Sequence, residues 1–345
     1  MPKTSIHFPA GFLWGTATAS HQVEGGNTNN NWYQWEMTEG KIKNGDRSGL
    51  TCNWWGGKWK DDLDRAAEAH QNSHRMSIEW SRVQPSPDRW DEDALEYYRQ
   101  IIRGMIDRKL VPMVTLHHFS DPLWLMEMGA WETDAVVPYF QRYVEKVVGA
   151  LKDTVKLWVT INEPNVYVWG GYMGGGFPPG KNDMNLGLQV LANMVRGHAV
   201  AYKTIHAVQP DARVGFALNY RDLQPARPGF PPDVWMANLQ AKIYNETFVG
   251  ALKTGKLDAV FKKISIPEAM GTQDYLGINY YTGDLVKFDL TAAGEMFGRR
   301  STPPGAVMSE TGFIASVPDG MFRALHWARR YNVPLMVTEN GVEDS

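Results

Sequence analysis

The sequence contains one cysteine, Cys52, so no disulfide can form within the chain. Cys52 has no CxxC partner, no His-rich neighbour and no nearby base, which argues against both a metal site and a catalytic thiol. No apolar run approaches the roughly 20 residues that cross a bilayer. The first residues, MPKTSIHFPA, lack a charged-then-apolar leader. We therefore expect a cytoplasmic protein with no membrane partner.

An excess of basic charge is also missing. The chain has 35 Lys and Arg against 38 Asp and Glu, a net charge of −3. Proteins that bind a phosphate backbone usually show a basic excess or stripe, so we expect no nucleic-acid partner. No GxGxxG motif follows the first predicted strand, which disfavours a doubly wound nucleotide-binding sheet.

Tryptophan is abundant, with 14 residues in 345. Many of these rings fall in Gly-, Asn- or Pro-rich segments: Trp32, Trp35, Trp54, Trp55, Trp59, Trp124, Trp131 and Trp169. Aromatic rings in loops are suited to stacking on the apolar faces of sugars, and core or lid packing is the alternative for a good part of them.

Short apolar runs alternate with longer amphipathic stretches, which is typical of βα units around a parallel sheet. Strands are predicted at Phe12–Ala19, His74–Trp80, Val111–His118, Val155–Glu163, Arg213–Asn219, Asp274–Tyr281 and Pro334–Asn340. Helices are predicted at Asp93–Asp107, Asp134–Leu151, Leu186–Val208, Asp233–Leu252 and Pro318–Arg330.

No linker divides the chain, so residues 1–345 are predicted to form one domain. The expected fold is a TIM (β/α)8 barrel, with about seven βα units present. The Gly- and Pro-rich stretch Thr282–Val317 is predicted to be a loop that walls or covers a site.

Polar side chains gather at the ends of the predicted strands. They are His21, Gln22, Glu24, Arg75, Glu79, His117, His118, Asn162, Glu163, Asn279, Tyr280, Tyr281, Glu339 and Asn340. Reactive groups of a TIM barrel project from the C-terminal ends of its strands, so we expect these residues to meet at one rim.

Glu163 and Glu339 end the fourth and seventh predicted strands and can face each other across the barrel mouth. Hydrolysis of an acetal by a retaining mechanism needs one protonated and one ionised carboxyl group, roughly 5–5.5 Å apart. Arg75 beneath Glu339 would keep it ionised, and Glu163 beside that charge would stay protonated. A buried ion pair within the barrel is the structural alternative.

Several motifs resemble those of glycoside hydrolase family 1, the β-glucosidase and β-galactosidase family. They are FLWGTATASHQVEG from residue 12, RMSIEWSR at 75–82, TLHHF at 115–119, TINEP at 160–164, LGINYYT at 276–282 and VTENG at 337–341. The motifs stand in the family's order, and the resemblance extends over essentially the whole chain.

The resemblance implies a role for each matching residue. Glu163 matches the acid/base and Glu339 the nucleophile, while Arg75 and Tyr281 match residues that hold and tune the nucleophile. Gln22, His118 and Asn162 match positions that bind hydroxyls of the terminal sugar, and Asn279 lines the same pocket; His117 would support His118. Asn165 stands where many members carry Trp, so the ring that often stacks on the leaving group is either absent or replaced by Trp169. No metal or organic cofactor is expected.

The sequence ends at Ser345, directly after the nucleophile motif, where family members continue into an eighth strand and a closing helix. We expect that unit to be missing, and a complementary C-terminal segment or self-association to cover the open edges. The loop carrying Glu343, Asp344 and Ser345 would suit a cleavage or split point.

The expected function is a retaining β-glycosidase acting on terminal β-linked glucose or related sugars, with a small β-glycoside as its partner. Two alternatives stay open. The chain could bind sugars without hydrolysing them unless a C-terminal segment completes it, or it could act on 6-phospho-β-glycosides.

Overall fold

The computed structural model describes residues 7–342, and the split point expected at residues 343–345 lies outside them. Seven parallel strands form one sheet in chain order: β1 (Gly15–Ala17), β2 (Ser73–Ser77), β3 (Val111–His117), β4 (Leu157–Asn162), β5 (Arg213–Pro225), β8 (Tyr275–Phe288) and β10 (Leu335–Asn340). β9 (Gly298–Ser301) pairs antiparallel with β8, and β6 (Lys256–Asp258) and β7 (Lys263–Ser265) form a separate hairpin. The predicted parallel sheet of seven strands is confirmed.

Four helices match their predicted ranges to within two residues at each end: α5 (Glu92–Asp107), α7 (Val136–Leu151), α9 (Met184–Val208) and α12 (Asp319–Ala328). Asp91 caps α5 by accepting the Ala94 N–H at 2.8 Å, and Asp183 caps α9 in the same way. These caps explain why both helices begin where the acidic residues of the sequence place them.

Shorter helices fill the connections. The α-helices are α1 (Ser20–Val23), α2 (Asn31–Glu36), α3 (Trp59–Glu68), α4 (Trp80–Val83), α6 (Leu123–Glu127), α8 (Pro164–Val168), α10 (Pro231–Ala241) and α11 (Thr247–Thr254). Two π-helical segments, η4 (Trp169–Met173) and η5 (Lys242–Glu246), and six 3-10 turns complete the set: η1 (Lys43–Gly45), η2 (Trp54–Gly56), η3 (Ala130–Glu132), η6 (Pro267–Ala269), η7 (Ala293–Glu295) and η8 (Arg329–Tyr331).

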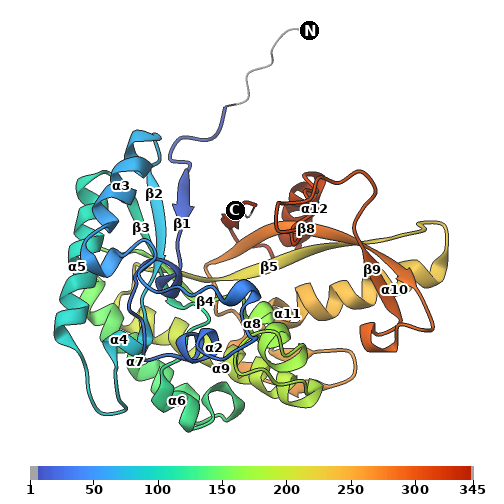
Figure 1. The fold of residues 1–345 in the computed structure, drawn as a ribbon, viewed down its shortest axis with the longest axis horizontal. Helices are drawn as coiled ribbons and strands as arrows, with labels where there is room; N and C mark the ends of the chain where they lie inside the picture. The colour runs from blue at the N-terminus through green and yellow to red at the C-terminus, as the bar shows by residue number, and fades with distance from the viewer. Residues whose placement is uncertain (1–6, 343–345) are drawn as a thin grey trace.

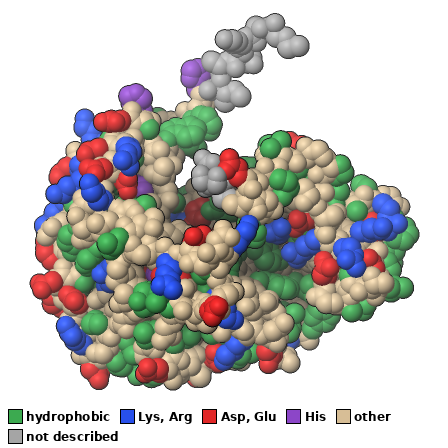
Figure 2. All heavy atoms as spheres, viewed as in Figure 1, with side chains coloured by type: hydrophobic (Ala, Val, Ile, Leu, Met, Phe, Trp, Pro, Cys, Tyr) green, Lys and Arg blue, Asp and Glu red, His purple; other side chains and the backbone are tan. Residues whose placement is uncertain are grey.

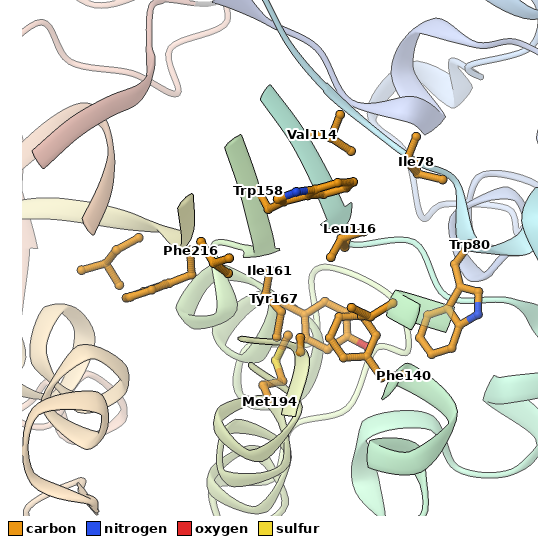
Figure 3. Packing of buried hydrophobic residues seen from close by; sticks show 14 of the residues in the cluster. Ile78, Trp80, Val114, Leu116, Phe140, Trp158, Ile161, Tyr167, Met194 and Phe216 are labelled. Carbon is orange, nitrogen blue, oxygen red and sulfur yellow. The ribbon is translucent and has the colours of Figure 1, made fainter. Parts of the chain in front are cut away.

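The sheet separates two hydrophobic layers. Its outer face packs on the surrounding helices, with Trp158 and Phe216 among the buried contacts (Figure 3). Its inner face carries a smaller cluster of Met113, Leu157, Val159, Ala217 and Tyr275. Leu13, just before β1, and Met336, in β10, both pack against this inner cluster. The sheet therefore curls until its two edge strands approach each other, as in a TIM barrel (Figure 1).

Several predicted boundaries were wrong. The second predicted strand ends at Ser77, because Trp80 starts α4, and the fifth runs on to Pro225. Only Gly15–Ala17 of the first predicted strand pairs with β2, while Phe12 and Trp14 pack with Phe8 in an exposed aromatic group. The stretch Thr282–Val317 is not a single loop, because β8 runs on to Phe288 and pairs with both β5 and β9. The helix predicted over Asp233–Leu252 is divided by the π-helical segment η5, which lies between α10 and α11.

Most of the tryptophans expected in loops belong to the core. Trp35, Trp54, Trp59, Trp124 and Trp131 are all buried, and Trp59 lies in α3, a helix that the sequence reading missed. Only Trp32, Trp55 and Trp169 of that group are partly exposed. Apolar burial therefore overrides the polar composition of the surrounding segments, and few of these rings are placed to meet a sugar.

Candidate active site

Two irregular strand ends place Asn162 and Glu339 inside the barrel. In β10, Val337 pairs with Ile278 and Glu339 with Asn279, so Thr338 is an extra residue in the strand. In β4, one extra residue separates the pairs Val159–Gly215 and Asn162–Ala217. Such bulges turn the following side chain to the other face of the sheet, and they are common next to active sites.

Glu163 follows directly and has a left-handed backbone, with φ 43° and ψ 59°. This conformation is unusual for a residue other than glycine and costs about 1 kcal/mol or more. Pro164 then starts α8, because proline is well suited to the first turn of a helix. The sharp turn at Glu163 directs its carboxyl group towards β5 and β8, where two amides receive it.

Arg75, in β2, is the centre of a buried network. Its Nη1 lies 2.6 Å from Glu339 Oε1, and its Nη2 lies 2.6 Å from Asn162 Oδ1. The Arg75 Nε donates to Thr115 Oγ1 at 2.8 Å. Tyr281 donates its hydroxyl to the second oxygen of Glu339. The arginine beneath Glu339, expected from the sequence, is therefore present.

Asn279 joins the two halves of the network. Its Nδ2 donates to Asn162 Oδ1 at 3.1 Å and to Glu163 Oε1 at 2.9 Å. Asn219 Nδ2, on β5, donates to the same Glu163 oxygen at 2.9 Å. Because Oε1 accepts two N–H groups, a proton on Glu163 is left to reside on Oε2.

The surroundings drive the two carboxyl groups to opposite protonation states. Burial, followed by the charge of Glu339, raises the pKa of Glu163 to about 7. Burial would also raise the pKa of Glu339, but the charge of Arg75 and the hydrogen bond from Tyr281 outweigh it and hold that pKa below its usual range. Glu163 is thus poised to donate a proton while Glu339 is ionised.

Hydrogen bonding fixes the tautomer of His118. Arg75 can only donate, so the Asn162 atom facing it must be Oδ1, and Asn162 Nδ2 must donate to His118 Nε2 at 3.0 Å. His118 therefore carries its proton on Nδ1, which is buried and has no partner among the described residues. Burial lowers the pKa of His118 to about 3, so the ring is neutral.

Some residues at the predicted rim have structural roles. Glu24 accepts from Arg82 and Tyr98, and Glu79 accepts from Ser20, Ser81 and Ser120, in a buried polar cluster.

Other rim side chains also stabilise the fold. The Tyr280 hydroxyl donates to Val317 O, Asn340 donates to Tyr280 O, and His21 contacts Asn30 and Ser48. Gln22 is exposed on α1, and no hydrogen bond in the described structure connects it to the other site residues.

His117 does not hydrogen bond to its neighbour His118. Its Nε2 lies 3.1 Å from Asp121 Oδ1, and its ring packs on Trp131 and Tyr167, both of which also donate to Asp121. Any support that it gives His118 is therefore indirect. Asp121 was not predicted from the sequence, because two of its four partners, Tyr167 and Asn31, come from distant segments and meet it only after folding.

The sequence reading also missed Asn219 and Tyr244, which lie behind Glu163. The Tyr244 hydroxyl donates to Asn219 Oδ1 at 3.2 Å. Asn165, the residue after the TINEP motif, ties the two together by donating to the backbone oxygens of both. Trp169 packs against the Tyr244 ring with centroids 6.2 Å apart. An asparagine at position 165 thus braces the wall next to Glu163.

Among residues 7–342, no cluster of three or more His, Cys, Asp or Glu side chains is arranged to hold a metal ion. Within the same residues, no helix combines the length and apolar character needed to cross a membrane.

Comparison with known proteins agrees with this fold and site. A model of the family described as glycosyl hydrolase family 1 matches residues 4–345. β-Glucosidase A of Thermotoga maritima is 30% identical over 97% of this chain and 78% of that protein. The cytosolic β-glucosidase of Homo sapiens is 27% identical over 98% of this chain and 80% of that protein.

Solved structures of family 1 glycosidases also resemble this fold closely. A β-glycosidase from Pyrococcus horikoshii superposes with a TM-score of 0.89 at 36% identity, covering 98% of this chain and 77% of the other. The family 1 β-glucosidase of Thermotoga maritima in complex with castanospermine superposes with a TM-score of 0.90 at 28% identity, covering 97% and 78%. A curled parallel sheet with paired carboxyl groups at its rim is the architecture of a TIM-barrel glycosidase. The chain belongs to glycosyl hydrolase family 1.

Proposed function

We propose that this protein is a retaining β-glycosidase that hydrolyses terminal β-linked glucose or a related sugar. The observation that carries the proposal is the placing of Glu163 and Glu339 in one continuous hydrogen-bond network through Asn279, Asn162 and Arg75, which raises the pKa of Glu163 and lowers that of Glu339. Acetal hydrolysis with retention uses this division of labour between two carboxyl groups.

In the first step, Glu163 donates the Oε2 proton to the glycosidic oxygen as Glu339 attacks the anomeric carbon. Arg75 and Tyr281 hold the Glu339 carboxylate in place and keep it ionised. In the second step, Glu163, now ionised, removes a proton from water, which displaces Glu339 from the sugar. Both chemical roles fall to carboxyl groups, so the scheme needs no metal or organic cofactor.

Sugar binding is proposed for the side chains beside this pair. The half-buried His118 ring would contact a sugar hydroxyl, and Asn162 is fixed beside it by Arg75. Gln22, exposed on α1 directly after the edge strand β1, would be the third sugar-binding side chain. The names of the similar proteins, β-glucosidases and a β-glycosidase, support glucose as the first sugar to test.

The test is incubation with a 2-deoxy-2-fluoro aryl β-glucoside, followed by intact and peptide mass measurement. The fluorine slows both steps, so a covalent glycosyl adduct on Glu339 is expected to accumulate. Sugar binding with no adduct would contradict the proposal and favour a non-hydrolysing sugar-binding protein. Turnover of a 6-phospho-β-glucoside in preference to the glucoside would favour the phosphoglycosidase alternative.

A cytoplasmic location and an association with a complementary C-terminal segment stay predictions. The same incubation, repeated with that segment added, tests the second of them through the yield of adduct.

A further inference from the structure

Beyond the site, β5 and β8 continue as a two-stranded ribbon that leaves the barrel and carries β9 and α10 (Figure 1). The ribbon starts at Asn219 and Asn279, which are paired across the two strands and which both hold Glu163. In the proposed function, Glu163 protonates the leaving oxygen. The ribbon therefore forms the wall on the side where the leaving group, the aglycone, departs.

Two arginines lie in this wall. Arg221, two residues beyond Asn219 on β5, forms a two-point ion pair with Asp284. Arg300, on β9, donates from Nε to Gln240 Oε1 at 2.8 Å, and its side chain makes no ion pair with any described residue. Two carboxylates lie near it: Asp284, which is bound to Arg221, and the exposed Glu295, which accepts from the Arg300 backbone N–H at 3.1 Å. Arg300 is thus a partly buried guanidinium without a counter-ion.

A short chain of contacts leads from Arg300 to the acid/base. Gln240, which holds Arg300, and Tyr244 are four residues apart on the continuous segment formed by α10 and η5, about one helical turn. The Tyr244 hydroxyl donates to Asn219, and Asn219 donates to Glu163. Burial, followed by the charge of Glu163, raises the pKa of Tyr244, whereas the charges of Arg221 and Arg300 lower it. Glu163 and both arginines are therefore near Tyr244.

No carboxylate of the described residues binds the Arg300 guanidinium directly. Burial and the neighbouring charge of Arg221 lower the pKa of Arg300, which means that the guanidinium is held at an electrostatic cost. The Asp284 carboxylate forms its ion pair with Arg221 and not with Arg300. The view of all atoms shows a hollow between the barrel and the ribbon, with Lys or Arg side chains along the ribbon side (Figure 2). A carboxylate or phosphate on a ligand would supply the missing counter-charge through charge-assisted hydrogen bonds.

We propose that Arg300, assisted by Arg221, forms an aglycone subsite for β-glucosides whose leaving group carries a carboxylate or another anionic group. The inference rests on the proposed glycosidase function and adds the class of aglycone. Arg221 stands two strand residues, about 7 Å, beyond Asn219, which is close to the span of one ring attached to the glycosidic oxygen.

The test compares kcat/KM for the β-glucoside of 4-hydroxybenzoate with that for its methyl ester. Near neutral pH the two aglycones have similar shape but differ by one charge. The ratio of acid to ester is measured in the wild type and in the variants Arg300→Gln, Arg300→Lys and Arg299→Gln. Arg299 is the matched control, because it is adjacent in β9 but exposed and paired with Asp289.

The Arg300→Gln variant is expected to lower the ratio about tenfold, the worth of one hydrogen bond to a charged group. The change should fall mainly on KM of the acid, because the contact is made in both the ground state and the transition state. Arg300→Lys should keep part of the preference, and Arg299→Gln all of it. Added KCl should reduce the wild-type ratio.

An unchanged ratio in Arg300→Gln, with the ester hydrolysed as fast as by the wild type, would overturn the aglycone subsite alone. A wild-type protein that hydrolyses neither glucoside would overturn the proposed function instead. If Arg300→Gln lost activity on both substrates equally, Arg300 would have a structural role, which also contradicts the subsite.

Discussion

Arg75 and Glu339 are 264 residues apart in the chain, yet Nη1 of the arginine lies 2.6 Å from Oε1 of the glutamate, and both side chains are largely withdrawn from solvent. The contact crosses from β2 to β10, over the inside of the curled sheet. It favours the ionised form of Glu339, the form that the proposed nucleophilic attack requires.

Replacing Arg75 by Gln is expected to raise the pKa of Glu339, because the cation that favours the carboxylate is removed. The acid limb of the kcat/KM profile should therefore move to higher pH. Loss of the partner from a largely buried carboxylate should also lower the free energy of unfolding by about 3 kcal/mol. Urea titration measures the stability change, with the exposed Arg65→Gln as a control that should leave it unaltered. A profile that does not move would contradict the role given to Arg75.

The pH dependence of activity should fall off above about 7, where Glu163 loses the proton that it must donate. The sign follows from its raised pKa, since the active form is the acid. Glu163→Gln is expected to reduce kcat/KM for an alkyl β-glucoside about 10²–10⁴-fold and to remove the alkaline limb. An aryl glucoside with a good leaving group should suffer less. If the alkaline limb persisted in Glu163→Gln, another group would be the acid.

Asn219 and Tyr244 are expected to act as positioning residues for Glu163. The Asn219 N–H favours the ionised form of Glu163, so Asn219→Ala should move the alkaline limb to higher pH while reducing kcat. Tyr244→Phe removes the hydroxyl that orients Asn219 and should produce a smaller shift in the same direction. The control is Tyr202→Phe, whose hydroxyl bonds Asp274. Equal pH profiles in all three variants would leave these residues a purely structural role.

Asp121 is expected to matter for stability more than for chemistry. Its carboxylate accepts hydrogen bonds from His117, Trp131, Tyr167 and Asn31 in a fully buried environment. Asp121→Asn replaces one acceptor oxygen by a donor and should lower the free energy of unfolding by about 3 kcal/mol, as loss of a hydrogen bond to a buried charge does. Denaturation followed by tryptophan fluorescence measures the loss. A stable variant would show that the four donors find other partners.

Much of the fold was predictable, because strands and helices differ in their hydrophobic period and two of the three longest helices begin at the acidic caps Asp91 and Asp183. The motifs also placed Arg75, His118, Asn162, Glu163, Asn279, Tyr281 and Glu339, which the structure joins in one network. What each of them does in a reaction stays a proposal.

The rest depends on tertiary contacts. The extension of β8 to Phe288 depends on pairing with β5 and β9, and the π-helical segment η5 lies where Tyr244 reaches Asn219. Neither has a signal in the local sequence. The prediction that tryptophans in loops meet a sugar failed for the same reason. Trp54 and Trp131 stand in Gly- and Asn-containing segments of the sequence but are packed among apolar side chains in the fold.

The bulge at Thr338 makes the direction of the Glu339 side chain depend on the register of β10 against β8. Along β10, Met336 and Thr338 face inward by alternation, and Glu339 faces inward only because one residue is unpaired. If Thr338 paired regularly with Asn279, the bulge would disappear and the Glu339 carboxylate would turn towards the helices, although the motif letters would be unchanged. Deleting one residue between Met336 and Glu339 would instead leave the carboxylate facing inward by alternation. In this strand, therefore, shortening by one residue should preserve the direction of the carboxylate, whereas any change that draws Thr338 into the pairing should reverse it.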